Sequence, residues 1–262
     1  MTEAQRDLPD YRTPPLIEVV FGVKFTPLPK WRIPHIGAFW QLVAQEYGKC
    51  EHAPPFGDSS FTDPTTGIPL PRVWLLNATD DKLIQMQQGR FLFNWRRRPT
   101  AAKYPRYQSL VEEYFKLLET FEKFTSEKEL GELSWEQFEL TYLNHIPQPE
   151  GWSFPTDFER VIDRVRWQPG GSLLRHPFAM GWQATFPFGE KTGTLQVKVN
   201  PAKQTESQQE LILLELVARG LPAAAPRDNM RDWFDRAHEW IVRGFAELTS
   251  EEAQRDLWVK HA

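Results

Sequence analysis

Residues 72–107 read RVWLLNATDDKLIQMQQGRFLFNWRRRPTAAKYPRY, and the rest of the fold is interpreted around them. Two runs rich in β-branched, aromatic and other apolar residues flank the polar group Ala78–Lys82. Runs of this kind on either side of a polar turn predict a β-hairpin. We expect its second strand to include Ile84–Trp95 and to lead into a dense basic and aromatic segment.

The elements around this hairpin predict a ferredoxin-like unit. Residues Leu16–Phe25 are β-branched and aromatic between prolines, which predicts a strand. Apolar residues at helical spacing predict a helix over Pro34–Tyr47, and a proline-rich loop follows over Lys49–Pro71. After the hairpin we expect an amphipathic helix over Arg106–Phe124 and a strand over Trp135–Ile146. This order is that of the ferredoxin-like βαββαβ motif, in which the first and third strands are central.

The second half of the chain has a different order of elements, αβββα, which predicts an antiparallel sheet with helices packed on it. The apolar residues alternate in the first two strands and are almost uninterrupted in the third. The predicted elements are a short helix with Thr156 as its N-cap, strands over Phe178–Phe186, Leu195–Val199 and Leu211–Val217, and a long helix from Asp228 that restarts at a capping box of Thr249 and Glu252.

We therefore expect an α+β protein built from two halves. Residues 1–15 are polar and interrupted by proline, which predicts a flexible N-terminal arm. Residues 16–147 form the ferredoxin-like half, with the loop 49–71 inserted in it. Residues 148–262 form the second half and end in a long amphipathic helix. The sheets of the two halves are expected to be either shared or packed face to face.

The composition is that of a soluble protein of a reducing compartment. Of the 262 residues, 40% are hydrophobic and 25% are charged, as in ordinary globular domains. The single cysteine, Cys50, excludes an intrachain disulfide and a zinc site built from several thiolates. No apolar run approaches the roughly 18 residues of a membrane helix, and the polar N-terminus does not resemble a signal peptide. We expect a cytoplasmic location and no membrane partner.

The basic and aromatic segment is the candidate binding surface. Between Lys82 and Glu112 the chain has seven positive side chains and no negative one, although its net charge is −4. Guanidinium groups pair with carboxylates and phosphates, and aromatic rings fill protein hot spots or stack on bases. Three interpretations stay open: a core with a solvated cationic rim, a contact for an acidic protein, or a site for single-stranded nucleic acid or phosphate. The contact residues selected are Arg90, Trp95, Arg96, Arg97, Arg98, Lys103, Tyr104 and Arg106.

Polar residues also occur inside predicted strands, where apolar ones would cost less free energy to bury. Asn94 lies in the hairpin, and the run Tyr142–His145 lies near the end of the strand that closes the first half. Such groups either satisfy a neighbour's hydrogen bonds or contact a ligand.

Familiar catalytic arrangements are poorly represented in the sequence. Cys50 and His52 lie too close together on a short loop to align as nucleophile and base, and no G-x-S-x-G motif occurs. The six histidines do not pair at metal-ligand spacing, and no glycine-rich phosphate loop occurs. The nearest approach to a metal-dependent nuclease is Asp163 with Gln196 and Lys198, where Gln replaces the carboxylate that Mg²⁺ prefers. We therefore expect no metal and no cofactor.

Several segments together resemble a sporadically distributed family of uncharacterised bacterial proteins of about this length. The segments are PPLIEVVFGVKF, LIQMQQGRFLFNWRR, YPRYQSL, TYLNHI and HEWIVRGFAELT, at residues 14–25, 83–97, 104–110, 141–146 and 238–249. The resemblance covers most of the chain and rests on the order of the segments. It implies a bacterial cytoplasmic protein encoded by accessory genes, and it brings no activity and no catalytic residues.

These observations predict a non-catalytic adaptor that holds a macromolecular partner, which we expect to be a protein. The resemblance suggests an antitoxin-like or defence-associated role, and self-association as a homodimer stays open. One alternative is RNA or single-stranded DNA binding through residues 90–107, although Arg90–Phe93 lacks the glycine of the matching RNA-recognition strand. The other alternative is a divergent metal-dependent nuclease.

Overall fold

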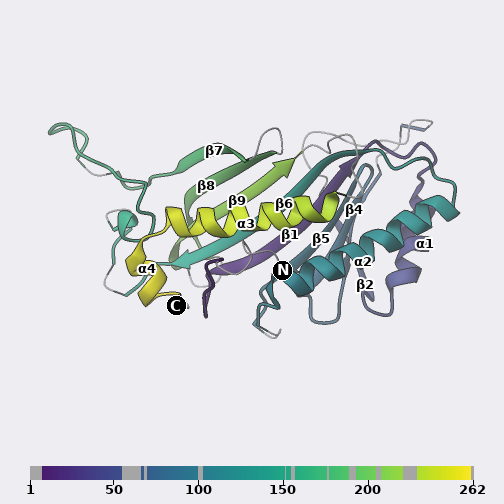
Figure 1. Cartoon of the computed structure of the whole chain (residues 1–262), viewed down its shortest axis with the longest axis horizontal. Coiled ribbons are helices and arrows are strands. Elements are labelled where there is room, and N and C mark those ends of the chain that lie inside the picture. The colour runs from purple at the N-terminus through teal and green to yellow at the C-terminus, as the bar shows by residue number, and fades with distance from the viewer. Residues whose placement is uncertain are drawn as a thin grey trace. The chain divides into compact units, whose positions relative to one another are not determined.

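A computed structural model defines the fold, and it confirms the α+β class (Figure 1). Within the described residues, four α-helices and nine strands occur, and the strands follow the order β2-β3-β4-β5-β1-β6-β9-β8-β7 in an antiparallel sheet. The described residues are 8–54, 66–67, 70–99, 103–150, 152–154, 157–175, 177–188, 193–204, 208–220 and 229–260.

The chain divides into two compact units, and it passes from one unit to the other after Ile17, Leu140, Arg219 and Met230. We call Glu18–Leu140 together with Gly220–Met230 the N-terminal unit. The C-terminal unit consists of Met1–Ile17, Thr141–Arg219 and Arg231–Ala262.

The N-terminal unit is a twisted sheet with one apolar face that packs on two helices. Alternate residues of β1 are almost fully buried, and the Phe21 ring stacks on Tyr114 of α2 with centroids 5.3 Å apart. Phe91 of β5 stacks on Phe121 of α2 at 4.8 Å, so the aromatic residues form the core here. The elements are β1 (Leu16–Phe25), α1 (Ile33–Val43), β2 (Lys49–Ala53), β3 (Arg72–Leu76), β4 (Lys82–Gln87), β5 (Arg90–Arg96), α2 (Arg106–Glu127) and β6 (Trp135–Pro147). The first two residues of β1 and the residues of β6 after Leu140 belong to the C-terminal unit.

Strands β1 and β5 are internal in the sheet. They pair antiparallel, with Phe21 opposite Phe93 and Glu18 opposite Arg96. The ferredoxin-like arrangement itself is not established, because the sheet has more strands than that motif and continues through β3 to β2.

The predicted continuous strand Ile84–Trp95 is wrong, because the chain turns at Gln88 and Gly89. Gln87 of β4 pairs with Arg90 of β5, which leaves two residues in the turn. Gly89 has a φ of 80°, a left-handed conformation that glycine adopts without a steric penalty. Strong apolar runs on both sides of the turn concealed it in the sequence.

The predicted loop Lys49–Pro71 begins as a strand. Residues Lys49–Ala53 form β2, which pairs antiparallel with β3 at the edge of the sheet. Four of its five residues are exposed, so the apolar alternation that would predict a strand is missing. Most of the remainder of that predicted loop lies outside the described residues.

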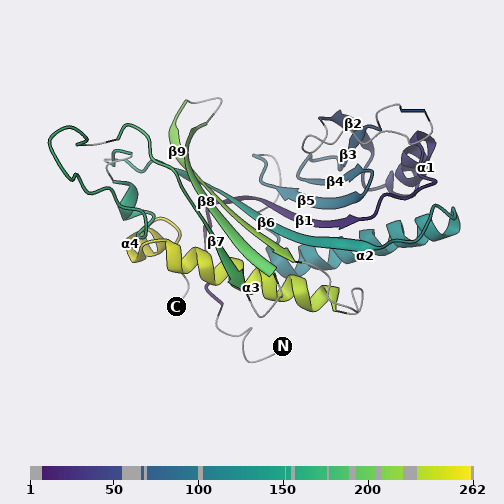
Figure 2. The same ribbon diagram turned by 90° about the horizontal axis from the view of Figure 1, so that it is seen from above.

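In the C-terminal unit, α3 lies along strands β7 to β9 (Figure 2). Phe188 of β7 contacts two tryptophans of α3. The centroid of its ring lies 6.1 Å from that of Trp233 and 5.4 Å from that of Trp240. The run Leu211–Val217, which is apolar except for Glu215, lies in β9, and all of its residues are buried except Leu213 and Glu215, which are half-buried. The elements are the short 3-10 helix η2 (Phe158–Arg160), β7 (Trp182–Phe188), β8 (Gly193–Lys203), β9 (Glu210–Gly220), α3 (Met230–Leu248) and α4 (Glu251–Asp256).

Three local predictions for this unit need correction. The short helix expected from Thr156 is only the turn η2, and Thr156 itself lies outside the described residues. Phe178 precedes β7 and is 98% exposed, so it is not part of a half-buried strand. The cap of α4 is Ser250, whose Oγ accepts a hydrogen bond from the Ala253 amide at 3.0 Å, whereas the Thr249 hydroxyl donates to Phe245 O.

Candidate binding site

Trp95 is not available as a contact residue, because it is only 1% exposed. It lies on the same side of β5 as Phe91 and Phe93, which face the helices. Tyr104 packs on its indole with ring centroids 5.0 Å apart, and the Arg106 guanidinium lies 5.9 Å from the Tyr104 ring centroid. Of the two aromatic residues selected for the predicted surface, Trp95 is therefore part of the core, and Tyr104 packs over it.

Arg96 and Arg98 converge on one backbone oxygen. Strand alternation places Arg96 on the opposite face of β5 from Trp95. Arg96 Nη2 and Arg98 Nε donate to Asp80 O at 3.3 and 3.2 Å. Neither guanidinium forms a salt bridge with a carboxylate among the described residues, and Arg96 Nε is buried there without a hydrogen-bond partner. We call Arg96 and Arg98 the arginine pair.

The turn that supplies this oxygen is held in a definite shape. Asp80 has a φ of 56°, in the left-handed region that Asp tolerates better than most residues. Its carboxylate is engaged elsewhere, because Lys49 Nζ lies 2.8 Å from Asp80 Oδ1. This contact, made by a lysine of β2, lowers the pKa of Asp80, and the charges of the arginine pair lower it further.

Trp74 of β3, which is two strands away from β5 in the sheet, contacts two of the arginines. The guanidinium carbons of Arg72 and Arg96 each lie 5.5 Å from the centroid of its ring. Cation–π contacts of this type hold guanidiniums in place without neutralising their charge. Sequence reasoning missed Arg72 and Trp74 because they are far from the basic run, although the alternation of β3 places them on its polar face.

A hydrogen-bonded chain of side chains continues from Arg72 across four adjacent strands. Gln85 Oε1 of β4 accepts from Arg72 Nη2 and, at 3.0 Å, from Trp74 Nε1. Gln85 Nε2 donates to Asn94 Oδ1 of β5 at 2.5 Å, and Asn94 Nδ2 donates to Glu18 Oε1 of β1 at 2.6 Å. Asn94 was predicted as a buried polar residue, and it is 3% exposed. Its structural role is to connect Gln85 with Glu18.

Burial dominates the electrostatics of this face. It raises the pKa of Glu18, although the hydrogen bond from Asn94 and the charges of three arginines act in the opposite direction. It also lowers the pKa of Arg96, and the positive charge of Arg98 lowers it further, whereas the negative charges of Glu18, Asp80 and Glu51 raise it. The arginines of this face thus lie close together in a partly desolvated setting with these carboxylates nearby, and a guanidinium pair of this kind can bind an anion.

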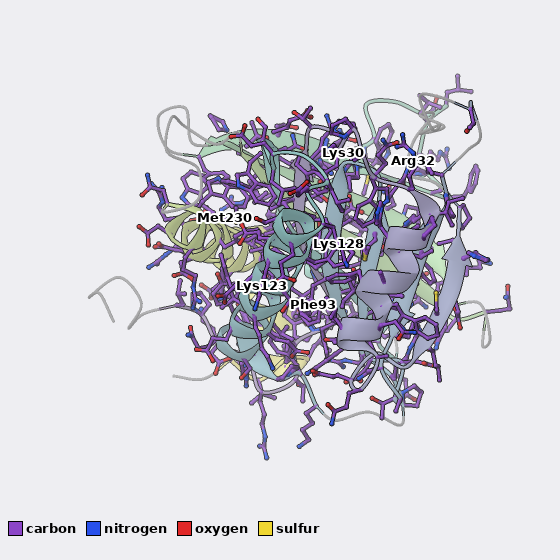
Figure 3. All side chains as sticks on the ribbon, turned by 90° about the vertical axis from the view of Figure 1, so that its right-hand side faces the viewer. Lys30, Arg32, Phe93, Lys123, Lys128 and Met230 are labelled. Atoms are coloured by element: carbon purple, nitrogen blue, oxygen red, sulfur yellow. The ribbon has the colours of Figure 1, made fainter. Side chains whose placement is uncertain are left out.

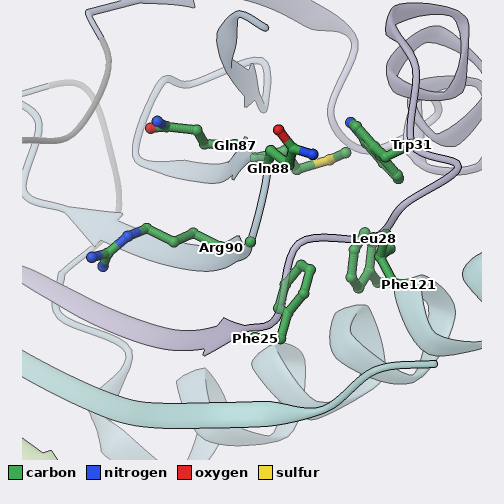
Figure 4. Close-up of a pocket in the computed structure, with 9 residues that line it drawn as sticks. Phe25, Leu28, Trp31, Gln87, Gln88, Arg90 and Phe121 are labelled. Carbon is green, nitrogen blue, oxygen red and sulfur yellow. The ribbon is translucent and has the colours of Figure 1, made fainter. Parts of the chain in front are cut away.

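The other selected residues do not join the arginine pair. Arg97 and Lys103 are exposed beside it in sequence. Arg90 lies at the far end of β5, beside a small pocket lined by Phe25, Trp31 and other apolar residues. Figure 4 shows the Arg90 guanidinium pointing away from these rings. The charge of Arg90 lowers the pKa of Arg72, after the larger effect of burial.

Catalytic and metal-binding arrangements gain no support from the geometry. Among the described residues, no group of three or more His, Cys, Asp or Glu side chains could hold a metal ion. Lys198, named for the nuclease alternative, lies opposite Glu215 of β9, and their charged atoms are 3.5 Å apart. Desolvation and the neighbouring Glu51 raise the pKa of the Cys50 thiol, which disfavours the reactive thiolate.

Comparison with known proteins returned no match: no family model, no curated protein and no solved structure is similar to this chain. In the part of the chain that the structure describes, no helix is long and apolar enough to span a membrane.

Proposed function

We propose that the protein is a non-catalytic binding protein that holds an acidic segment of a protein partner through the arginine pair. The observation that carries this proposal is the convergence of Arg96 and Arg98 on Asp80 O without a carboxylate partner among the described residues. Two guanidiniums held this close repel each other, and a carboxylate placed between them relieves the repulsion. Each guanidinium keeps donors for such a ligand, because arginine has five N–H groups.

A protein segment fits this face better than a nucleic acid strand. Single-stranded nucleic acids bind largely by stacking bases on accessible aromatic rings. Here Trp95 is buried, Tyr104 packs against it, and the Trp74 ring already has two guanidiniums over it. Carboxylates need only the guanidinium edges, so the remaining donors favour an acidic peptide.

The proposed bacterial accessory role, antitoxin-like or defence-associated, rests on the segment resemblance alone. A cytoplasmic location and a possible homodimer belong to the same proposal. The arginine pair supports a binding role of any of these kinds, because it requires only a partner that presents carboxylates.

The test compares the wild-type protein with the double variant Arg96→Gln and Arg98→Gln. Fluorescently labelled poly-glutamate and a single-stranded RNA oligonucleotide of equal length serve as probes, and fluorescence anisotropy gives their affinities. Hydrogen bonds between charged groups contribute about 1.5–3 kcal/mol each, so loss of the pair should weaken poly-glutamate binding about tenfold or more. The wild-type protein should bind poly-glutamate more tightly than RNA.

A matched control removes two positive charges elsewhere. Lys116 and Lys123 are exposed on α2, and Figure 3 labels Lys123 on this helix. The variant Lys116→Gln with Lys123→Gln should bind poly-glutamate as the wild type does. Equal loss in both double variants would reduce the effect to net charge and refute the proposal. Tighter, arginine-dependent RNA binding would support the nucleic acid alternative instead.

A further inference from the structure

The loop between η2 and β7 carries the most exposed apolar side chains of the described chain. Leu173 is 91% exposed, Leu174 is 68% exposed and Phe178 is 98% exposed. In Figures 1 and 2 the green segment that precedes β7 extends away from the strands and from α3 of the C-terminal unit. We call Arg166–Gly181 the apolar loop. Its apolar residues occur together, whereas single exposed apolar residues are common on any surface.

The base of the apolar loop is closed by side-chain to backbone hydrogen bonds. Trp167 Nε1 donates to Arg175 O at 2.8 Å, and Arg175 Nε donates to Ser172 O at 3.2 Å. The Arg166 guanidinium contacts Asp163 Oδ1 at 2.8 Å at the beginning of the loop. These contacts tie the two sides of the loop together and leave Leu173 and Leu174 at its tip.

Arginine is the charged residue of this loop, and one arginine is paired with carboxylates at its base: Arg166 lies 2.8 Å from Asp163 Oδ1 and 3.5 Å from Glu159 Oε2. From Arg164 to Phe188 the sequence has three arginines, Arg164, Arg166 and Arg175, and no Asp or Glu. Arg164 and Arg175 are exposed. In a protein with a net charge of −4, the loop is therefore a local cationic region around exposed Leu and Phe side chains.

We propose that the apolar loop docks on an anionic lipid surface. Leu, Phe and Trp side chains partition into the interface of a bilayer, while neighbouring arginines contact anionic headgroups. A protein hot spot is normally surrounded by residues that exclude water, and Leu173 and Phe178 have no such surround in the described chain because they are more than nine-tenths exposed. Lipid provides that surround itself. Only side chains enter the interface, because the loop backbone remains hydrated.

This inference is independent of the arginine pair, which belongs to the N-terminal unit. It also requires no helix that crosses the membrane, since docking of this type is peripheral. It differs from the expectation of no membrane partner, because the structure exposes Leu173, Leu174 and Phe178 on one loop together with Arg175, and Arg164 is exposed just before that loop.

Co-sedimentation with vesicles tests the proposal. The wild-type protein is mixed with vesicles of phosphatidylcholine and phosphatidylglycerol, and separately with vesicles of phosphatidylcholine alone. We expect binding to the anionic vesicles to exceed binding to the neutral ones by about tenfold or more and to weaken as salt is added. The triple variant Leu173→Ser, Leu174→Ser and Phe178→Ser should lose about tenfold or more of this binding.

The control is Leu42→Ser, since Leu42 is an apolar residue of α1 that is 57% exposed and lies outside the loop. It should bind vesicles as the wild type does. A second readout uses the single cysteine: in Cys50→Ser with Ser172→Cys, an environment-sensitive dye at position 172 should shift its emission to the blue on anionic vesicles.

Several outcomes would overturn the proposal. Wild-type protein that stays in the supernatant with anionic vesicles would do so, as would a triple variant that binds undiminished. A dye at position 172 whose emission does not change would show that the loop does not enter the interface. Loss of poly-glutamate binding with vesicle binding intact affects only the proposed function, so the two failures are distinguishable.

Discussion

His238 should make the stability of the protein depend on pH in a way that one substitution removes. It lies on α3, and a hydrogen bond of 2.9 Å joins its Nδ1 to the hydroxyl of Tyr142 on β6. The residue as a whole is half-buried, but its imidazole is packed among protein atoms, and this desolvation lowers its pKa from 6.5 to about 3. The imidazole is therefore neutral in the folded protein over a range of pH in which an unfolded chain would protonate it.

The sign and size of the effect follow from proton binding. Below about pH 6.5 the unfolded state binds one proton more than the folded state at this residue, so stability rises with pH. The slope approaches about 1.4 kcal/mol per pH unit until the pH nears the folded pKa. Between about pH 6.5 and pH 5 the free energy of unfolding should therefore fall by up to about 2 kcal/mol through His238 alone.

Urea unfolding of wild type and His238→Gln at a series of pH values measures this term. Gln does not titrate, but it can still form a hydrogen bond with Tyr142. The loss of stability that the substitution itself causes should therefore not vary with pH. Other titrating groups affect both proteins equally and cancel in the difference. The difference in free energy of unfolding should shrink by up to about 2 kcal/mol from neutral pH to about pH 5. A difference that stays constant over this range would refute the reasoning.

A direct measurement supplements the unfolding experiment. The Cε1 proton of His238 should show no titration in the NMR spectrum of the folded protein above about pH 5. A midpoint near the ordinary value of a histidine would show that solvent reaches the imidazole, and it would contradict the assignment even if the protein lost stability in acid for other reasons.

Two further predictions concern stability and use the same urea assay. Glu113→Ala should lower the free energy of unfolding by about 3 kcal/mol, because the Tyr47 hydroxyl at 2.7 Å and Lys82 Nζ at 2.6 Å lose their shared acceptor. Exposed Glu119→Ala on the same helix should have little effect, and equal losses in the two variants would contradict this account. Gly89→Ala should cost about 1–2 kcal/mol, because the φ of 80° is strained for any other residue and the new Cβ would lie 3.0 Å from a backbone oxygen. A neutral effect would mean that the turn rearranges without penalty.

Elements with a long and regular apolar period could be predicted from the sequence. Helix α2 was predicted over Arg106–Phe124 and extends to Glu127, because its apolar residues repeat at helical spacing over several turns. Strands β1 and β6 were predicted for similar reasons. In these cases the residues that form the element also carry the pattern that identifies it.

Edge strand β2 and the turn at Gly89 depended on information from elsewhere in the chain. The exposed residues of β2 adopt a strand because their backbone pairs with β3, and nothing in their own side chains requires it. The turn interrupts an apolar run whose two parts pair with each other. Hydrogen bonding between strands is made by the backbone, so it leaves a weak signal in the sequence.

By itself the sequence determined the α+β class, the cationic segment and the polar character of Asn94. Only the tertiary structure decided that Trp95 is core, that Arg96 lies on the opposite face, and that Trp74 and Glu18 come from other strands to join it. The alternation of residues along one strand indicates which side chains share a face of the sheet. It does not indicate which strands are neighbours or in which register they pair. Those are set by long-range packing, and the candidate site exists only where four strands are brought together.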